Sequence, residues 1–405
     1  MSTQNKQTAL VAFSGGLDTS MLVPYMRKHY GVKEVITCVV DTGGMNEAEK
    51  RQVAARADEV GADQHVYIDG SQALYDEIIK FLIYGNVSRD GYPLCVSSER
   101  VIQAREVIAA AKERGISLVA NGCTGAGNDQ YRFDLAVHVM AGKGKAIQSV
   151  APVREHELTR EFSQNFLREH DISVPEKAQY SYNVGLWGLS IGGKETHTSS
   201  GLIPEHAWYS KIDTALRDLK LELTFAQGEP VKLAYGNKQV EGPLEVIREL
   251  AVLGGKMGIG RHYHVGTSIP GKKGRIAYES PAADIIYEAH RTLEKHTLTQ
   301  AQIFHKQLIA GELGRLIHEA HFFDPLMEDV RAYLQSSQKR VSGVCHICLE
   351  PGQIASVTVD SPNDLLGAGG SVYGEHADFY DAKDAEGSAK LHAYEQVIYH
   401  SIDGA

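Results

Sequence analysis

The segment at residues 12–20 reads Ala-Phe-Ser-Gly-Gly-Leu-Asp-Thr-Ser and directly follows an apolar run. Gly15 and Gly16 would let the backbone approach a ligand closely, and free N–H groups at the start of the next helix can bind anionic oxygens. The segment therefore predicts a nucleotide-phosphate site. It has neither the Gly-Lys-Ser/Thr ending of a Walker loop nor a Gly-x-Gly-x-x-Gly fingerprint. Three side chains could cap that helix: Asp18, Thr19 and Ser20.

A second dense segment, residues 121–132, holds three glycines, a threonine, three carboxamides, a carboxylate and an arginine. Thr124, Asn128, Asp129 and Arg132 offer hydrogen-bond donors, acceptors and both charges, which suits a zwitterionic ligand. The alternative interpretation is a capped loop in which Asn128 and Asp129 start the next helix.

Residues 14–20 resemble the pyrophosphate-binding PP-loop of N-type ATP pyrophosphatases, which cleave ATP between its α and β phosphates. Together, in this order and spacing, the two segments resemble the argininosuccinate synthase family, and the likeness runs through nearly the whole chain. Further matching patches lie at residues 92–97, 151–154, 180–182, 258–261, 274–281 and 321–325.

The resemblance implies an enzyme that joins citrulline and aspartate to form argininosuccinate, releasing AMP and pyrophosphate from ATP. In the family the ureido oxygen of citrulline attacks the α-phosphorus, and the aspartate amine then displaces AMP from a citrullyl-adenylate. No protein nucleophile is needed, so catalysis should come from positioning and charge stabilisation. Mg²⁺ would bridge phosphate oxygens. The resemblance also implies a cytoplasmic homotetramer.

Carried over to this chain, the resemblance implies four catalytic residues: Ser14, Asp18, Asp129 and Arg132. The ATP site would comprise Ala12, Phe13, Ser14, Gly15, Gly16, Leu17, Asp18, Thr19, Ser20, Val40 and Gly122. Aspartate would meet Thr124, Asn128 and Asp129. Citrulline would meet Tyr92, Ser97, Asn128, Arg132, Ser181, Ser190 and Tyr278. From residue type alone, the two tyrosines could equally be core aromatics and the three serines caps or turn residues.

Two departures from the family pattern lie on the citrulline side. Gly266 stands where many members have a glutamate, and residues 181–186 lack the acidic run common in the family. A rearranged citrulline pocket, or a paralogue with another ureido or amide acceptor, would explain both. A tRNA-modifying PP-loop ligase and a non-catalytic nucleotide-binding homologue are further alternatives. Intact motifs argue against the homologue, and a missing basic tract argues against the tRNA enzyme.

The charge balance of the 405 residues, 41 basic against 51 acidic side chains, argues against nucleic-acid or anionic-membrane partners. No apolar run reaches the roughly 18 residues of a membrane span. Five cysteines, an odd number, suit reduced thiols in the cytoplasm. Cys345 and Cys348 have metal-like spacing but sit in a predicted strand, and we expect no metal there.

Alternating apolar runs and helical patterns predict an α/β fold with a doubly wound parallel sheet in the first part of the chain. Strands are expected at 9–13, 35–40, 65–68, 118–121 and 146–150, and helices at 46–60, 71–84 and 98–114. Loops after Phe13, Val40 and Asn121 then fall at the carboxyl ends of strands, where doubly wound folds bind ligands.

The remainder predicts a mixed α+β domain with a boundary near 165–175, after which residues 185–201 read as glycine-rich connection. We divide the chain into an ATP-binding domain (1–168), a substrate and oligomerisation domain (169–378) and a C-terminal helical arm (379–405). Strands are expected at 221–225, 229–233, 239–242, 275–278, 344–349 and 354–359, and helices at 244–253, 283–292, 299–320 and 323–336. The amphipathic residues 385–402 could form an exchanged arm or pack on their own subunit.

Overall fold

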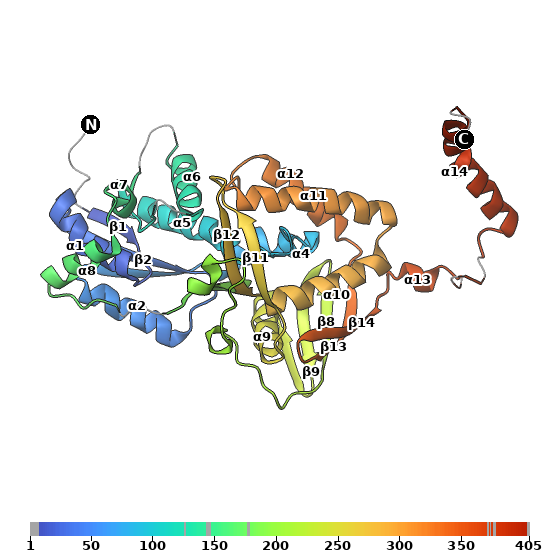
Figure 1. Cartoon of the computed structure of the whole chain (residues 1–405), viewed down its shortest axis with the longest axis horizontal. Helices are drawn as coiled ribbons and strands as arrows, with labels where there is room; N and C mark the ends of the chain where they lie inside the picture. Colours follow the sequence, from blue (N-terminus) through green and yellow to red (C-terminus); the bar gives the residue numbers. More distant parts are fainter. Residues whose placement is uncertain are drawn as a thin grey trace.

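A five-stranded parallel sheet forms the first half of the protein (Figure 1). The computed structural model describes residues 8–124, 127–142, 147–175, 179–370, 372, 374–375 and 378–402. The strands are β1 (Thr8–Ala12), β2 (Glu34–Asp41), β3 (Gln64–Asp69), β4 (Leu118–Ala120) and β5 (Gln148–Val150), in the order β3-β2-β1-β4-β5. The predicted doubly wound sheet is confirmed, and the predicted start of β5 at Ala146 lies outside the described residues.

Helices cover both faces of this sheet because β1 is apolar on both sides. Ala9 and Val11 pack in one core with α1 and α8, while Leu10 packs in another with α5 and α6. The helices are α1 (Leu17–Tyr30), α2 (Glu47–Glu59), α5 (Cys95–Glu113), α6 (Asp129–Ala141), α7 (Pro152–Glu155) and α8 (Arg160–Glu169). Since β2 and β4 flank β1, the loops after β1 and β4 diverge at a topological switch point, the usual ligand site of such sheets.

Local signals explain several helix ends. Asn46 and Glu49 form a capping box at the start of α2, and Gly31, with a φ of 65°, ends α1 in the left-handed region. Helix α5 begins at Cys95, three residues before the predicted start at Ser98, because Leu94 adopts a φ of 60° and turns the chain directly into the helix.

Residues between β3 and α5 leave the sheet and enter the second half of the protein. They form α3 (Ser71–Leu74), a π-helical turn (Tyr75–Ile79) and α4 (Lys80–Gly85), where one uninterrupted helix was predicted. Their apolar side chains share one core with helices and strands beyond residue 186. Lys306, buried beside Glu294, donates to the Tyr84 carbonyl at 2.8 Å. The two halves of the chain are therefore interlocked through one core.

Two antiparallel sheets and a set of helices make up the second half. One sheet has the order β11-β12-β7-β6 and the other β10-β9-β8-β13-β14. The strands are β6 (Ser181–Gly185), β7 (Gly188–Gly192), β8 (Leu219–Ala226), β9 (Glu229–Tyr235), β10 (Lys238–Glu241), β11 (Arg261–Thr267), β12 (Lys273–Glu279), β13 (Gly343–Glu350) and β14 (Gln353–Asp360). The helices are α9 (Pro243–Lys256), α10 (Pro281–Thr297), α11 (Gln300–His318), α12 (Leu326–Ser337) and α13 (Leu365–Ala368), with short 3-10 turns at Lys194–His197 and Glu205–Ala207.

Three of these strands correct the sequence analysis. Strand β7 lies within the glycine-rich residues 185–201, β6 ends where that stretch begins, and neither of these strands nor β11 was predicted. Glycines in β6 and β7 lower strand propensity, yet here they permit close packing: a Cβ atom on Gly188 would lie 2.6 Å from the Cys95 sulfur. The remaining predicted strands and helices of this half are present with shifted ends.

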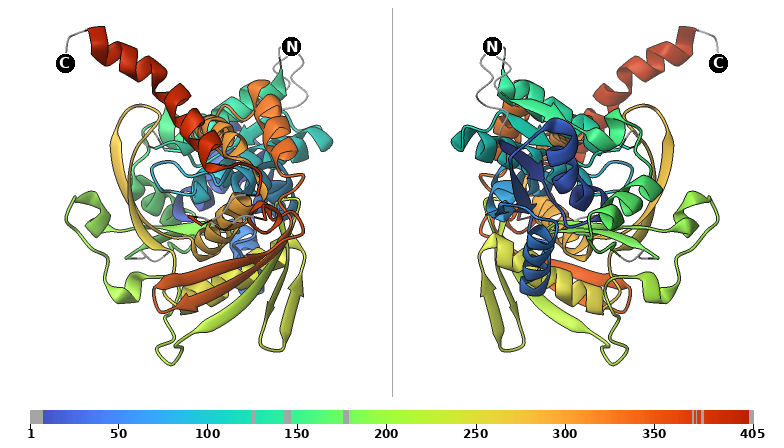
Figure 2. Two further views of the ribbon diagram at one scale, coloured as in Figure 1. Left: turned by 90° about the vertical axis from the view of Figure 1, so that its right-hand side faces the viewer. Right: turned by 90° about the vertical axis from the view of Figure 1, so that its left-hand side faces the viewer.

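The C-terminal helix α14 (Ala382–Ile402) stands away from the rest of the protein in Figure 1 and extends beyond the outline of the other elements in Figure 2. None of its residues is buried, so the alternative in which it packs on its own subunit is wrong. Within the residues that the structure describes, no helix combines the length and apolar character needed to cross a bilayer.

Candidate active site

The turn between β1 and α1 presents backbone rather than side chains. Gly15 has a φ of 74°, a conformation that side chains rarely adopt, and Gly16 is the N-cap of α1 without a side-chain hydrogen bond to the helix. Ser14 Oγ lies 3.2 Å from Thr19 Oγ1 and accepts a hydrogen bond from the Gly16 N–H at 3.4 Å. An uncapped helix N-terminus behind a glycine turn is suited to bind phosphate oxygens.

Buried polar groups hold this turn from behind. Ser20 is fully buried, donates to the Gly15 carbonyl at 3.3 Å and accepts from Arg56 Nε at 2.9 Å. Asp18 accepts a hydrogen bond from Ser163 Oγ on α8 at 3.1 Å. These side chains tie the turn to α2 and α8 and so fix its shape.

A cavity of about 1020 Å³ opens in front of the turn. Six predicted ATP-site residues line it: Ala12, Phe13, Ser14, Gly15, Gly16 and Val40. The other five, Leu17, Asp18, Thr19, Ser20 and Gly122, stand outside its wall. Gly122 still meets the turn, because a Cβ atom on it would lie 3.0 Å from the Thr19 methyl group. The loops after β1 and β4 are therefore in contact.

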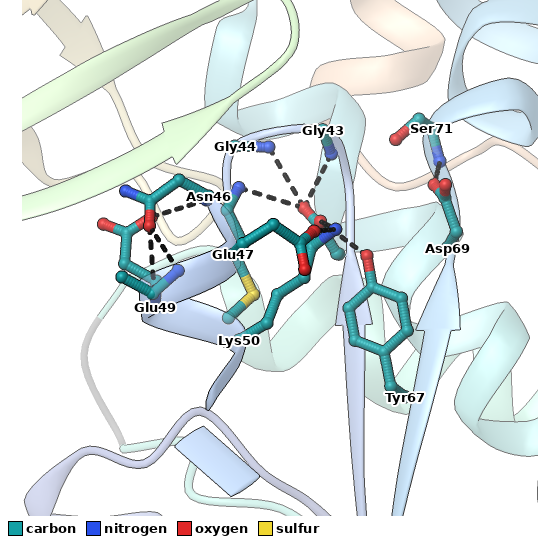
Figure 3. Close-up of polar contacts among 12 residues, drawn as sticks. Gly43, Gly44, Asn46, Glu47, Glu49, Lys50, Tyr67, Asp69 and Ser71 are labelled. Atoms are coloured by element: carbon teal, nitrogen blue, oxygen red, sulfur yellow. Dashed lines mark hydrogen bonds and ion pairs between the residues drawn. The ribbon is translucent and has the colours of Figure 1, made fainter. Parts of the chain in front are cut away.

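The loop after β2 closes another side of the cavity around Asp41, which sequence reasoning missed. Its buried carboxylate accepts from the N–H groups of Gly43, Gly44 and Met45 at 2.8, 3.1 and 3.2 Å. The Tyr67 hydroxyl donates to its other oxygen at 2.8 Å, and Figure 3 shows these donors converging. The Asp-Thr-Gly-Gly sequence at the end of an apolar strand was the available signal. We call this loop and the β1–α1 turn the phosphate side of the cleft.

Charged side chains gather opposite it, and Arg100 on α5 connects them to the cavity that it lines. Arg100 Nε lies 3.2 Å from Asp129, and its Nη2 donates to Asn183 Oδ1 on β6 at 2.9 Å. Arg132, which is 3% exposed, lies 3.3 Å from Asp129 and donates to the His318 carbonyl at 2.9 Å. Its Nε is buried without a partner among the described residues.

Two aromatic residues from distant segments extend this group. The rings of Tyr92 and Tyr278 pack edge to face with centroids 4.9 Å apart, and His264 stacks on Tyr92 at 5.1 Å. Burial raises the pKa of both tyrosines and lowers the pKa of His264, so all three are neutral near pH 7. We call Tyr92, Arg100, Asp129, Arg132 and Asn183 the acceptor side of the cleft.

The remaining predicted substrate contacts have separate positions. Asn128 Oδ1 accepts from the Ile269 N–H at 2.8 Å, which joins α6 to the β11–β12 turn. Ser190 on β7 accepts from Asn183 Nδ2 at 3.4 Å, and Ser181 donates to the Gly192 carbonyl at 3.4 Å. Ser97 is buried in α5, and Thr124 is exposed after β4. None of the nine predicted substrate-contact residues lines the cavity itself.

The position of Gly266 shows what fills the space of an absent side chain. A Cβ atom there would lie 2.6 Å from His264 Nε2, because residues two apart in β11 share a face. The imidazole therefore occupies the region beside Tyr92 where a longer side chain at 266 would project. Sequence reasoning noted the glycine and missed the histidine two positions before it.

Comparison with known proteins covers both halves of the chain. Residues 8–173 match the family model described as the argininosuccinate synthase N-terminal HUP domain, and residues 180–399 match the C-terminal domain of the same family. The argininosuccinate synthase of Xanthomonas axonopodis pv. citri is 34% identical over 418 residues, covering 100% of this chain and 97% of its own. The argininosuccinate synthase of Methanocaldococcus jannaschii is 33% identical, and the alignment covers 97% of this chain and 98% of that protein. The chain therefore belongs to the argininosuccinate synthase family.

Proposed function

We propose that this protein joins citrulline and aspartate to form argininosuccinate, consuming ATP and releasing AMP and pyrophosphate in arginine biosynthesis. The observation that carries the proposal is the match of both family domains along the chain, with the glycine turn open to a nucleotide-sized cavity. The chemistry is consistent, because a ureido carbon is a poor electrophile until its oxygen becomes a leaving group. Adenylation supplies that leaving group, and the intermediate would be a citrullyl-adenylate.

On this proposal the phosphate side binds ATP. The uncapped N–H groups after Gly16 would hold phosphate oxygens, and Val40 with the loop behind it would contact the adenine. Mg²⁺ would accompany ATP and neutralise its phosphates. Phosphate oxygens would be its main ligands, and Asp18 at the start of α1 would help to arrange them, because the described part of the chain holds no group of three or more metal-binding side chains.

The acceptor side would take the two amino acids. Asp129 would receive the aspartate ammonium, and Arg132 the citrulline carboxylate, since its buried Nε has no partner among the described residues. Arg100 lies between the cavity and Asp129, so it would face developing phosphate charge. Substrates would replace part of the Arg100–Asp129–Arg132 pairing, which holds these charges in place beforehand.

The test is pyrophosphate release by purified protein with ATP and Mg²⁺, adding citrulline and aspartate separately and together, with the product identified by mass. Argininosuccinate formed only with both amino acids is the expected result. Nucleotide binding without product would overturn the citrulline assignment and favour another ureido or amide acceptor.

We also propose that the protein is a cytoplasmic homotetramer in which α14 packs against a neighbouring subunit. Helix α14 has no buried residue and leaves apolar side chains in water: Leu391, Tyr394, Val397, Ile398, Tyr399 and Ile402. The odd number of cysteines supports a reducing compartment. Light scattering of the full chain and of a variant ending at residue 378 tests the arm. A tetramer that persists without α14 would contradict its role.

A further inference from the structure

Glu99 is a carboxylic acid buried in the cavity wall that the sequence motifs did not single out. It lies on α5 next to Arg100 and is 1% exposed. Its Oε1 has no hydrogen-bond partner among the described residues. A Cβ atom on Gly185 would overlap that oxygen, so the carboxyl group sits directly against the backbone of β6. A buried acid in this position needs a physical explanation.

Glu99 lies next to a contact between the two halves of the protein, formed by residues 42–44 and residues 184–186, which we call the joint. The loop after β2 meets the β6–β7 turn backbone to backbone, and the Leu186 N–H donates to the Thr42 carbonyl at 3.0 Å. A Cβ atom on Gly43 would lie 2.9 Å from the Leu186 Cβ, and one on Gly44 would overlap the Val184 carbonyl. The joint therefore has no room for extra atoms, and the packing of its two backbone segments depends on the neighbouring Glu99 side chain.

Burial favours the neutral form of Glu99. Burial, with smaller contributions from the carboxylates of Asp129 and Asp41, raises the pKa of Glu99 to about 8, although the charge of Arg100 and a hydrogen bond with Thr42 act in the opposite direction. The Cys95 thiol on the same helix also faces it, and burial keeps the pKa of that thiol high. At pH 7 an uncharged acid therefore occupies the joint, and ionisation above about pH 8 would place an anion against the β6 backbone.

We propose that Glu99 is a positioning residue for the acceptor side: its buried carboxyl group, packed against Gly185, holds the β6–β7 hairpin against the loop after β2. The hairpin carries Asn183, which holds Arg100 at 2.9 Å, and Arg100 in turn holds Asp129 at 3.2 Å. Seating the hairpin thus sets the positions of both charged groups. The catalytic part of this inference rests on the proposed function.

The first test measures KM for each substrate from about pH 6.5 to about pH 9.5 in the wild type and in Glu99→Gln. We expect the wild-type KM values for citrulline and aspartate to rise above about pH 8, by up to roughly tenfold per pH unit, while that for ATP changes little. Glu99→Gln cannot ionise and should remove the rise. Glu113→Gln, at the exposed end of the same helix, is the control. Superimposable profiles of wild type and Glu99→Gln would overturn the proposal.

A second test is independent of turnover and separates failure of the inference from failure of the proposed function. Amide hydrogen exchange of residues 181–192 is followed against pH in the ligand-free protein. Protection at Val184, Gly185 and Leu186 should fall above about pH 8 in the wild type relative to Glu99→Gln at the same pH. Equal protection in both proteins at every pH would contradict the role of Glu99, whether or not argininosuccinate is formed.

A double-variant cycle guards against a disturbed fold in Glu99→Gln. Gly185→Ala adds a methyl group where the carboxyl lies, so it should raise the acceptor KM values at every pH. Adding Glu99→Ala makes room for that methyl group and should restore part of the loss. Additive effects of the two changes would show that Glu99 and Gly185 do not act on the same joint, and would overturn the proposal.

Discussion

The phosphate side of the cleft is built mainly from the backbone of two loops that each directly follow a strand, whereas the acceptor side is assembled from side chains that three separate segments contribute. On the phosphate side, Gly15 and Gly16 expose N–H groups, and buried side chains support them from behind. On the acceptor side, the Asp129 carboxylate pairs with Arg100 on α5 and with Arg132 on α6. The comparison teaches that a local motif can specify the first side, while the second exists only once the chain has folded.

The largest effect should come from Arg132→Ala, which removes a buried cation from the acceptor side. Losing a hydrogen bond from this charged group to the citrulline carboxylate costs about 1.5–3 kcal/mol, or roughly 10- to 150-fold in kcat/KM for citrulline. The KM for ATP should change little, because Arg132 lies outside the cavity wall. Arg291→Ala removes an exposed arginine and is the control. Steady-state kinetics in each substrate measure both, and an equal loss for ATP would erase the distinction between the two sides.

A smaller effect of the opposite selectivity is expected from Gly15→Ala. The φ of 74° costs a side chain about 1 kcal/mol or more, and the turn must distort to relieve it. We expect the KM for ATP to rise by roughly tenfold, with little change for citrulline. Gly31→Ala imposes similar strain at a φ of 65° far from the cavity, so it should lower only the thermal stability. Isothermal titration calorimetry measures the ATP affinity of both variants. Equal affinities of Gly15→Ala and Gly31→Ala for ATP would contradict the prediction.

The smallest effect should follow His264→Ala. Its ring stacks on Tyr92, and such contacts are worth about 0.5–1.5 kcal/mol, so the KM for citrulline should rise roughly two- to tenfold. His264→Phe keeps the stacking and should recover most of the loss. Unchanged citrulline kinetics in His264→Ala would show that the stacking of this histidine on Tyr92 does not contribute to citrulline binding.

The parallel sheet and its glycine turn could be predicted because their signals are local. An apolar run, two glycines and a helical pattern lie within residues 9–30, and the alternation of strands and helices along the chain predicts a parallel sheet. Helix α5 was predicted too, although its start was misplaced because nothing in the sequence marks the left-handed Leu94.

Strands β6, β7 and β11 could not be predicted because they contain glycines, and in β6 and β7 the same glycines allow close packing against α5. Their glycines read as loop, and only the folded structure shows that Gly185 and Gly188 are strand positions pressed against α5. Arg100 and Asn183 were missed because each looks like an ordinary surface residue until the other is brought within 2.9 Å. Pairings of high sequence separation leave no local signal.

The shared core beyond β3 has a consequence for how the reaction is aligned. Because the segment from α3 to α5 is wrapped by the second half, a polypeptide cut between the two family domains would leave large apolar side chains in water on both pieces. Folding must therefore bring the halves together as one unit. In the proposed reaction, the distance between ATP and the acceptor amino acid would therefore be set by a close-packed interior. Such an interior is stiffer than loops alone.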